Sequence, residues 1–298
     1  ALLTATSAED GSFSFENIPY GTWYVREIEQ PAGFVLDDTI YPVTIGADGQ
    51  VVEIKIVNRY VRGNIHLTKV DSEYPDNKLT GATFEVYKDS NANGKLDDGD
   101  ELLGTLTEKE IGEYGMNDLF YGRYFVKETK APEGFVLDTG VYEVMIDTNG
   151  KTYEVENKAG VGFINDAMRG NLKIVKTSSD GKVKGFAFRI TGANGYDIIL
   201  ETNDKGEIFI DGLRIGDYTI SEVNNSASSM YVIPADKKAT VKLGSTTIVE
   251  MHNVLRDTPK TGDTTNLPLL YALAGLSAVG IAVCGVIGFK KKKKEDRN

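Results

Sequence analysis

The sequence predicts an all-β protein made of tandem β-sandwich domains and followed by one C-terminal transmembrane helix. Short stretches in which apolar and polar residues alternate, bounded by Gly, Asn and Asp, recur along the chain and are typical of small sandwiches or barrels. No helical period of useful length is visible before residue 267. An uncharged apolar run then follows, and three earlier segments of the chain align with one another.

The composition excludes several classes of function. The chain has 44 acidic and 33 basic residues and a net charge of −11, so we expect no nucleic-acid partner. The single cysteine, Cys284, lies in the apolar run, which leaves no disulfide framework within one chain. The sequence shows no Gly-rich phosphate loop, no His/Cys metal cluster and no substrate-directed catalytic constellation, so we do not expect an enzyme.

The C-terminal region predicts an extracellular protein. Residues 267–289 carry no charge and are long enough to cross a bilayer as a helix. The lysine-rich segment 290–298 follows at once and marks the cytoplasmic side. The bulk of the chain is therefore expected outside, in a precursor that spans the membrane once. No signal peptide is visible, and we interpret the chain as a fragment of a longer secreted protein.

Internal repeats organise the chain. The segments NIPYGTWYVRE (17–27), DLFYGRYFVKE (118–128) and GLRIGDYTISE (212–222) align without gaps, and each has a glycine six residues before a glutamate. The segments IVNRYVRGNIHLTKVD (56–71) and FINDAMRGNLKIVKTS (163–178) also align, and each has an asparagine eleven residues before a lysine.

These alignments predict three copies of one unit, called here the first, second and third repeat. The predicted organisation is the C-terminal part of a truncated domain at 1–61, a complete domain with an inserted loop at 62–168, a complete domain at 169–256, and a C-terminal segment at 257–298.

Strand alternation directs charged and amide side chains toward the core of each complete repeat. Side chains two residues apart share one face of a strand, so Lys69 shares the face of Ile65 and Leu67, and Glu128 that of Tyr124 and Val126. The residues placed in this way are Lys69, Glu128 and Asn165 in the second repeat, Lys176, Glu222 and Asn253 in the third, and Glu27 and Asn58 in the first.

Burial of such groups predicts covalent chemistry. An unpaired buried charge is costly, and the group tends to neutralise by shifting its pKa. A neutral lysine amine is a nucleophile, and a protonated glutamate can donate to a carbonyl and shuttle protons. The predicted product is a Lys–Asn isopeptide bond with loss of ammonia. The alternative is satisfied polar core groups, or strand ends whose long side chains reach water; recurrence in two complete repeats favours the cross-link.

The chain resembles Gram-positive surface proteins built from Cna B-type (SpaA-like, prealbumin-like) domains. YFVKETKAPEGF resembles the E-box of that family and WYVREIEQPAGF a second copy, in which Pro31 or Pro132 suits the second position of a turn that Gly33 or Gly134 closes. The third copy lacks the proline. The resemblance implies immunoglobulin-like or prealbumin-like sandwiches with isopeptide bonds Lys69–Asn165, assisted by Glu128, and Lys176–Asn253, assisted by Glu222, and it implies that Glu27 and Asn58 belong to a triad whose lysine lies before residue 1.

The segment TPKTGD (258–263) resembles a cell-wall sorting signal of the LPXTG type. Thr258 stands where leucine is usual, and the other positions that match are Pro259, Lys260, Thr261 and Gly262. The resemblance implies cleavage by a sortase between Thr261 and Gly262, and covalent attachment through Thr261 to peptidoglycan or to a pilin lysine. A plain single-pass anchor is the alternative.

An insertion, DSNANGKLDDGDE (89–101), has the ligand spacing of an EF-hand calcium loop. The predicted ligands at positions 1, 3, 5, 7, 9 and 12 of residues 89–100 are Asp89, Asn91, Asn93, the Lys95 carbonyl, Asp97 and Asp100. The short final Asp and the neutral Asn ligands predict weak Ca²⁺ binding, and no other cofactor is expected. The alternative is an acidic, Gly-rich turn insertion.

The predicted function is a sortase-anchored surface stalk, cross-linked within its repeats, that projects an N-terminal adhesive region toward a host ligand. Two alternatives stay open: a pilus subunit that sortase joins to other pilin subunits, and the stalk of a cell-wall enzyme with an upstream catalytic domain. YPDNK (74–78) superficially resembles the lysine motif of pilins, but its place just after a strand favours a turn.

Overall fold

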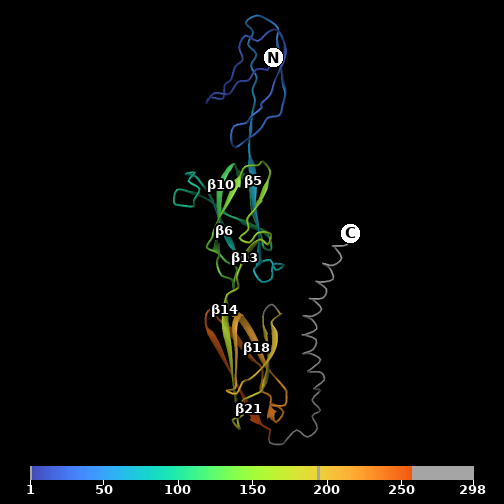
Figure 1. Cartoon of the computed structure of the whole chain (residues 1–298), viewed down its shortest axis with the longest axis vertical. Coiled ribbons are helices and arrows are strands. Elements are labelled where there is room, and N and C mark those ends of the chain that lie inside the picture. The colour runs from blue at the N-terminus through green and yellow to red at the C-terminus, as the bar shows by residue number, and fades with distance from the viewer. Residues whose placement is uncertain (1, 193–194, 257–298) are drawn as a thin grey trace, which may run out of the picture. The chain divides into compact units, whose positions relative to one another are not determined.

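The computed structural model describes residues 2–192 and 195–256, which form β-strands and connecting turns (Figure 1). The described residues contain no α-helix, so the predicted all-β class is confirmed. No helix within them is long and apolar enough to cross a membrane. The predicted span 267–289 and its lysine-rich tail lie outside these residues. The chain divides into two compact units between Met168 and Arg169.

The first repeat is built from two small strand pairs. Strand β1 (Gly21–Val25) pairs antiparallel with β3 (Tyr41–Ile45), and β2 (Phe34–Val35) pairs with β4 (Arg59–Tyr60). Trp23 lies opposite Val43 and is only half-buried. The apolar side chains of this repeat are therefore less enclosed than those of the other two.

The second repeat has two sheets, with strand orders β11-β10-β6-β7 and β12-β5-β9-β8; β13 also pairs with β5. Its strands are β5 (Arg62–Asp71), β6 (Thr83–Lys88), β7 (Glu101–Thr105), β8 (Thr107–Glu110), β9 (Glu113–Phe120), β10 (Gly122–Lys130), β11 (Val141–Ile146), β12 (Thr152–Glu154) and β13 (Phe163–Asn165). Buried side chains from both sheets form one core, and Leu67 of β5, Phe84 of β6 and Val126 of β10 are fully enclosed.

The third repeat has the same two-sheet plan, with orders β17-β14-β21-β19 and β16-β15-β18-β20. Its strands are β14 (Arg169–Ser178), β15 (Ala187–Gly192), β16 (Asp197–Glu201), β17 (Glu207–Arg214), β18 (Gly216–Val223), β19 (Tyr231–Val232), β20 (Lys237–Val241) and β21 (Thr246–Leu255). Its core again draws on both sheets, including Ile174 of β14, Phe188 of β15 and Ile220 of β18.

The last strand differs between these repeats. In the third repeat β21 runs unbroken and parallel to β14, from the Asn171–Thr246 pair to the Ser178–Asn253 pair. In the second repeat the equivalent strand is divided into β12 and β13, both parallel to β5, with residues 155–162 between them. The separation from the core glutamate to the asparagine is accordingly 37 residues in the second repeat and 31 in the third.

The proline turns lie one position later than predicted. The Phe34 N–H donates to the Pro31 carbonyl at 3.1 Å, and Phe135 to Pro132 at 3.1 Å, so each proline opens its turn instead of taking the second position. Gly33 and Gly134 then occupy the third position with φ of 84° and 83°. A type II turn requires a positive φ at its third position, and glycine adopts a positive φ without strain.

Candidate functional site

Three polar side chains of the second repeat are buried together in its core. Lys69 comes from β5, Glu128 from the end of β10 and Asn165 from β13, and their exposed fractions are 0%, 0% and 3%. Strand β13 runs parallel to β5, with Phe163 opposite Lys69, so the lysine and the asparagine belong to adjacent strands (Figure 1). The structure thus brings into one interior the three residues that strand alternation selected.

Glu128 and Asn165 are in direct contact. The Asn165 Nδ2 donates to Glu128 Oε2 at 2.8 Å and to the Val136 carbonyl at 2.7 Å. The same Glu128 oxygen accepts the backbone N–H of Asp138 at 2.8 Å. Glu128 Oε1 and Asn165 Oδ1 are buried and have no hydrogen-bond partner. One carboxyl oxygen and one amide oxygen of the same site are therefore buried without a hydrogen bond. Such unsatisfied groups cost folding free energy, and a catalytic role is one explanation for their presence.

Burial moves the charged groups of this site toward their neutral forms. It lowers the pKa of the Lys69 amine to about 8, although the carboxylates of Glu128, Asp138 and Asp71 oppose the shift. Burial also raises the pKa of the Glu128 carboxyl, against the hydrogen bonds from Asn165 and Asp138. The Lys69 Nζ donates only to the carbonyls of Phe163, at 3.0 Å, and Val70, at 3.3 Å, among the contacts described. Such an amine is closer to a nucleophile than a surface lysine is.

The third repeat repeats the arrangement. Lys176, Glu222 and Asn253 are buried, and the Asn253 Nδ2 donates to Glu222 Oε1 at 2.6 Å. Met251 lies opposite Lys176, so in both repeats the lysine faces the residue two positions before the asparagine. Glu222 Oε2 and Asn253 Oδ1 are again buried and unpaired.

Electrostatics and packing in the third repeat also follow the second. Burial lowers the pKa of Lys176 and raises that of Glu222. The Lys176 Nζ donates to the Thr177 carbonyl and lies 4.1 Å from the centroid of the buried Phe186 ring, whose face attracts a cation. The two sites therefore share the same three residue types, the same register and the same directions of pKa shift.

The first repeat holds two of the three groups. The Asn58 Nδ2 donates to both oxygens of Glu27, at 2.9 and 2.8 Å, and the Asp37 N–H donates to Glu27 Oε2 at 2.7 Å. Both side chains are half-buried. Within residues 2–61 no strand corresponds to β5 or β14, and the structure places no lysine against this pair.

An aspartate and a tyrosine that strand alternation does not identify lie beside the glutamate. Asp138 binds Glu128 through its N–H, and its carboxylate accepts the Tyr142 hydroxyl at 2.9 Å. In the first repeat Asp37 binds Glu27 in the same way and accepts the Tyr41 hydroxyl at 2.5 Å. A signal was present in the sequence, because the aspartate of an FVLD segment follows Glu27 and Glu128 by ten residues, and a tyrosine follows that aspartate by four.

The predicted calcium loop lies between strands β6 and β7. Its carboxylates are turned inward on the loop: Asp89 accepts the N–H groups of Asn93 and Gly94, and Asp97 accepts both Asn side-chain amides, from Asn91 at 3.0 Å and Asn93 at 2.6 Å. Asp100 accepts the N–H groups of Ser90 and Asp97. Within the described residues no three His, Cys, Asp or Glu side chains are grouped as metal ligands.

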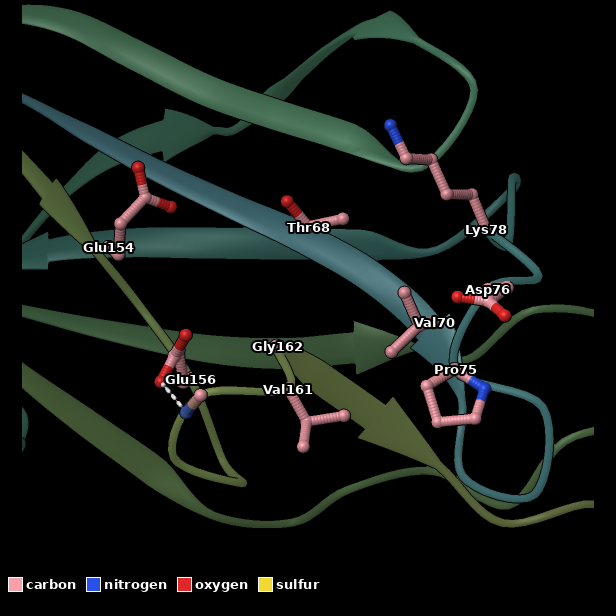
Figure 2. Close-up of a pocket in the computed structure, with 10 residues that line it drawn as sticks. Thr68, Val70, Pro75, Asp76, Lys78, Glu154, Glu156, Val161 and Gly162 are labelled. Atoms are coloured by element: carbon pink, nitrogen blue, oxygen red, sulfur yellow. Dashed lines mark hydrogen bonds between the residues drawn. The ribbon is translucent and has the colours of Figure 1, made fainter. Parts of the chain in front are cut away.

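A shallow pocket of about 340 Å³ lies over β5 in the second repeat. Figure 2 shows Thr68 and Val70 of β5 in the middle, with Lys78 on one side and Glu156 on the other. The Lys78 Nζ is paired with Glu113 Oε1 at 2.5 Å, and its side chain is 47% exposed.

The sorting residues 258–262 lie outside the described part of the chain, so the structure says nothing of them.

These observations define a class of protein: tandem all-β repeats in which a buried lysine, glutamate and asparagine recur. The family model described as "Prealbumin-like fold domain" (SpaA) matches residues 2–60, 63–159 and 170–254. These matches cover most of the 298 residues, and the protein belongs to this family.

Individual relatives agree with this assignment. The solved structure of the Bacillus anthracis TIE protein has a TM-score of 0.64 and 26% identity, over 84% of this chain and 44% of that one. The trypsin-resistant surface T6 protein of Streptococcus pyogenes serotype M6 is 26% identical over 204 residues, 58% of this chain and 35% of T6. Colossin-A of Dictyostelium discoideum is 22% identical over 251 residues, 74% of this chain and 2% of colossin-A. The chain spans less than half the length of each of these relatives.

Proposed function

We propose that this protein is the stalk of a Gram-positive surface protein whose complete repeats are each closed by a self-formed Lys–Asn isopeptide bond. The observation that carries the proposal is the recurrence of one buried triad in one register, Lys69–Glu128–Asn165 and Lys176–Glu222–Asn253. Membership of the SpaA-type family and similarity to a streptococcal surface protein support a place outside the cell.

The reaction needs no external reagent. The neutral amine of Lys69 attacks the side-chain carbonyl carbon of Asn165, the bond from that carbon to Nδ2 breaks, and ammonia leaves. The protonated Glu128 carboxyl gives its proton to the departing nitrogen, which already lies 2.8 Å from Glu128 Oε2, and takes up the proton that the amine loses, so the acid is regenerated. Burial keeps water away from the reacting carbon, so amide exchange is favoured over hydrolysis.

The bond stabilises a domain that has no disulfides. It joins the first strand of a repeat to its last strand, and so takes the part that a disulfide takes in other secreted domains. In the first repeat, the Glu27–Asn58 pair would react in the same way with a lysine strand supplied by chain before residue 1.

Anchoring to the cell wall completes the proposed role. A sortase would recognise residues 258–262 and join Thr261 to peptidoglycan, after the 267–289 segment has held the precursor in the membrane. A pilus subunit is the alternative, with Lys78, half-exposed beside the pocket of Figure 2, as the acceptor amine. Detergent-resistant ladders in wall extracts, lost in Lys78→Ala, would favour the pilin.

The loop at 89–100 is proposed to bind Ca²⁺ weakly. The ion would replace the Asn91 and Asn93 amide groups that now neutralise Asp97, and the amides would turn their oxygens inward. Calcium titration followed by amide NMR shifts should affect this loop alone, and Asp97→Ala should abolish the response. Shifts that persist in this variant would contradict the site.

The intact mass of the full chain tests the central proposal. We expect the protein to lack the mass of two ammonia molecules, and Lys69→Met or Glu128→Gln to restore one of them. Lys173→Met is the control, because Lys173 lies on β14, the strand of Lys176, but on the opposite face, where it pairs with Glu207 at 2.7 Å. The full calculated mass in the wild-type chain would contradict the cross-links.

A further inference from the structure

The strand that carries the asparagine is held differently in the second and third repeats. Its last strand is interrupted, so Asn165 stands on β13, which pairs with β5 over only three residues. In the third repeat Asn253 stands on β21, which pairs with β14 over eight residues. A short strand at the end of an eight-residue connection is free to shift unless something holds it.

Asn157, from the connection between β12 and β13, holds that strand. Its Oδ1 accepts the Ile164 N–H at 2.6 Å, and its Nδ2 donates to the Ile164 carbonyl at 2.8 Å. Both backbone groups of the residue before Asn165 are thus bound by one side chain. Glu156 and Gly162 of the same connection line the pocket of Figure 2, and Glu156 accepts the Gly160 N–H.

Asp138 fixes Asn157 in turn. Its Oδ2 accepts the Asn157 Nδ2 at 2.7 Å and the Tyr142 hydroxyl at 2.9 Å, and its Oδ1 accepts the Gly140 N–H. The Asp138 N–H meanwhile donates to Glu128. Asp138 therefore binds Glu128 through its backbone N–H. Through its carboxylate it binds Asn157, whose side chain holds β13.

We propose that Asp138 and Asn157 are positioning residues for the cross-link of the second repeat, together holding the Asn165 carboxamide against Glu128. The proposal rests on the proposed isopeptide chemistry and adds two residues whose side chains do not touch the reacting atoms; only the Asp138 backbone N–H reaches Glu128. Among the described residues of the third repeat, the position ten after Glu222 carries no carboxylate: it is Val232, which lies in β19 opposite Val254. In the third repeat the continuous pairing of β21 with β14 already holds the strand of Asn253, so no residue corresponding to Asn157 is needed.

The rate of cross-linking after refolding tests the proposal. The full chain is purified in denaturant, intact mass establishes that it is not cross-linked, and it is diluted into detergent-containing buffer. Samples are quenched over time, and peptide mapping assigns ammonia loss to each repeat. Asn157→Ala and Asp138→Ala should each slow the loss in the second repeat about tenfold, the effect of one or two hydrogen bonds on a barrier. The third repeat is the control within the same molecule.

Two further variants separate positioning from general damage. Glu156→Ala changes the same connection without touching β13, and the rate should stay at the wild-type value. Asp138→Asn keeps the size but removes one of the charges that face Lys69, the others being Glu128 and Asp71. Its pH–rate profile should move to lower pH, because the lysine then loses its proton more easily. Asn157→Ala should slow the reaction and leave the profile in place.

Failure of the proposed cross-link and failure of the positioning role give different results in these experiments. No ammonia loss in the second repeat of the wild-type chain contradicts the proposed function itself. Wild-type rates in Asn157→Ala and in both Asp138 variants, with the wild-type cross-link present, overturn only the positioning role. Near-UV circular dichroism monitors folding in parallel. If Asn157→Ala does not fold, Asp138→Asn decides the question. A slower ammonia loss in its second repeat together with a shifted pH–rate profile supports the proposal. A wild-type rate with an unshifted pH–rate profile refutes it.

Discussion

A lysine side chain that is fully enclosed in a β-sandwich is the feature from which the rest of the site follows. Lys69 has an exposed fraction of 0%, and burial lowers the pKa of its amine to about 8. The same burial acts on Glu128 in the opposite direction and favours its protonated form. A neutral amine has a free lone pair for attack, and a protonated carboxyl can give one proton to a leaving nitrogen while it takes another from the amine, so the pair ends with the charge it began with; the proposed reaction needs this condition.

The depressed pKa of Lys69 makes the stability of an uncross-linked variant depend on pH. In Asn165→Ala the amine stays free, with a pKa of about 8 in the folded chain against 10.5 as its ordinary value. The unfolded chain then binds more protons between these values, so the free energy of unfolding should rise with pH. We expect a gain of about 2 kcal/mol between pH 8 and pH 10, measured by urea denaturation.

The control for this titration is the double variant Lys69→Met, Asn165→Ala, which lacks the amine. Its stability should change little over the same range, and the difference between the two curves isolates Lys69. The range stops at pH 10 because tyrosines such as Tyr142, whose pKa is raised to about 12, stabilise the fold less above it. Parallel curves for the two variants would contradict the assigned pKa.

At the scale of strands and turns, the backbone of each triad lysine is hydrogen-bonded to a glycine carbonyl of the neighbouring turn. The Lys69 N–H donates to the Gly112 carbonyl at 2.7 Å, and the Lys176 N–H to the Gly206 carbonyl at 2.7 Å. Both glycines have a positive φ, and a Cβ on either would lie within 3 Å of the lysine carbonyl, at 2.8 and 2.6 Å. The turn before β9 or β17 thus sets the position of the lysine backbone.

Replacement of Gly112 by alanine should therefore disturb the cross-link as well as the fold. We expect Gly112→Ala to cost about 3 kcal/mol in the uncross-linked Lys69→Met background, since strain from the positive φ adds to the clash with the Lys69 carbonyl. Gly150→Ala is matched to it, with a similar φ of 78° and no atom within 4 Å of the added Cβ, and should cost about 1 kcal/mol. Equal costs in urea denaturation would show that the close approach is not significant.

Strand alternation predicted much of the site because it is a local property of the chain. Lys69, Glu128 and Asn165 each lie on a strand whose apolar neighbours reveal the inward face, and their burial agrees with that expectation. Asp138 and Asn157 could not be found in this way, since they reach the site through a backbone N–H and an irregular connection. The proline turns were misplaced by one residue, because the sequence of a turn does not reveal which carbonyl closes it.

At the scale of the whole molecule, the topology decides how tension passes through each complete repeat. A repeat begins on β5 or β14 and ends on β13 or β21, and in both cases the first and last strands are parallel neighbours. Force applied to the ends of a repeat would shear that pair of strands. The proposed isopeptide bond between them would transfer the force covalently and leave the residues enclosed by the bond unloaded.

Single-molecule pulling of the full chain from its ends tests this consequence. The chain between Lys69 and Asn165 is on the order of 100 residues, so its extension would add roughly 300 Å of contour length. We expect no such step in the wild-type protein at forces below those that break covalent bonds, and its appearance in Lys69→Met. Lys173→Met should behave as wild type, because that lysine lies outside the triad. An extension of this size in the wild-type chain would mean that the second repeat is not closed, whatever stability it has by other measures.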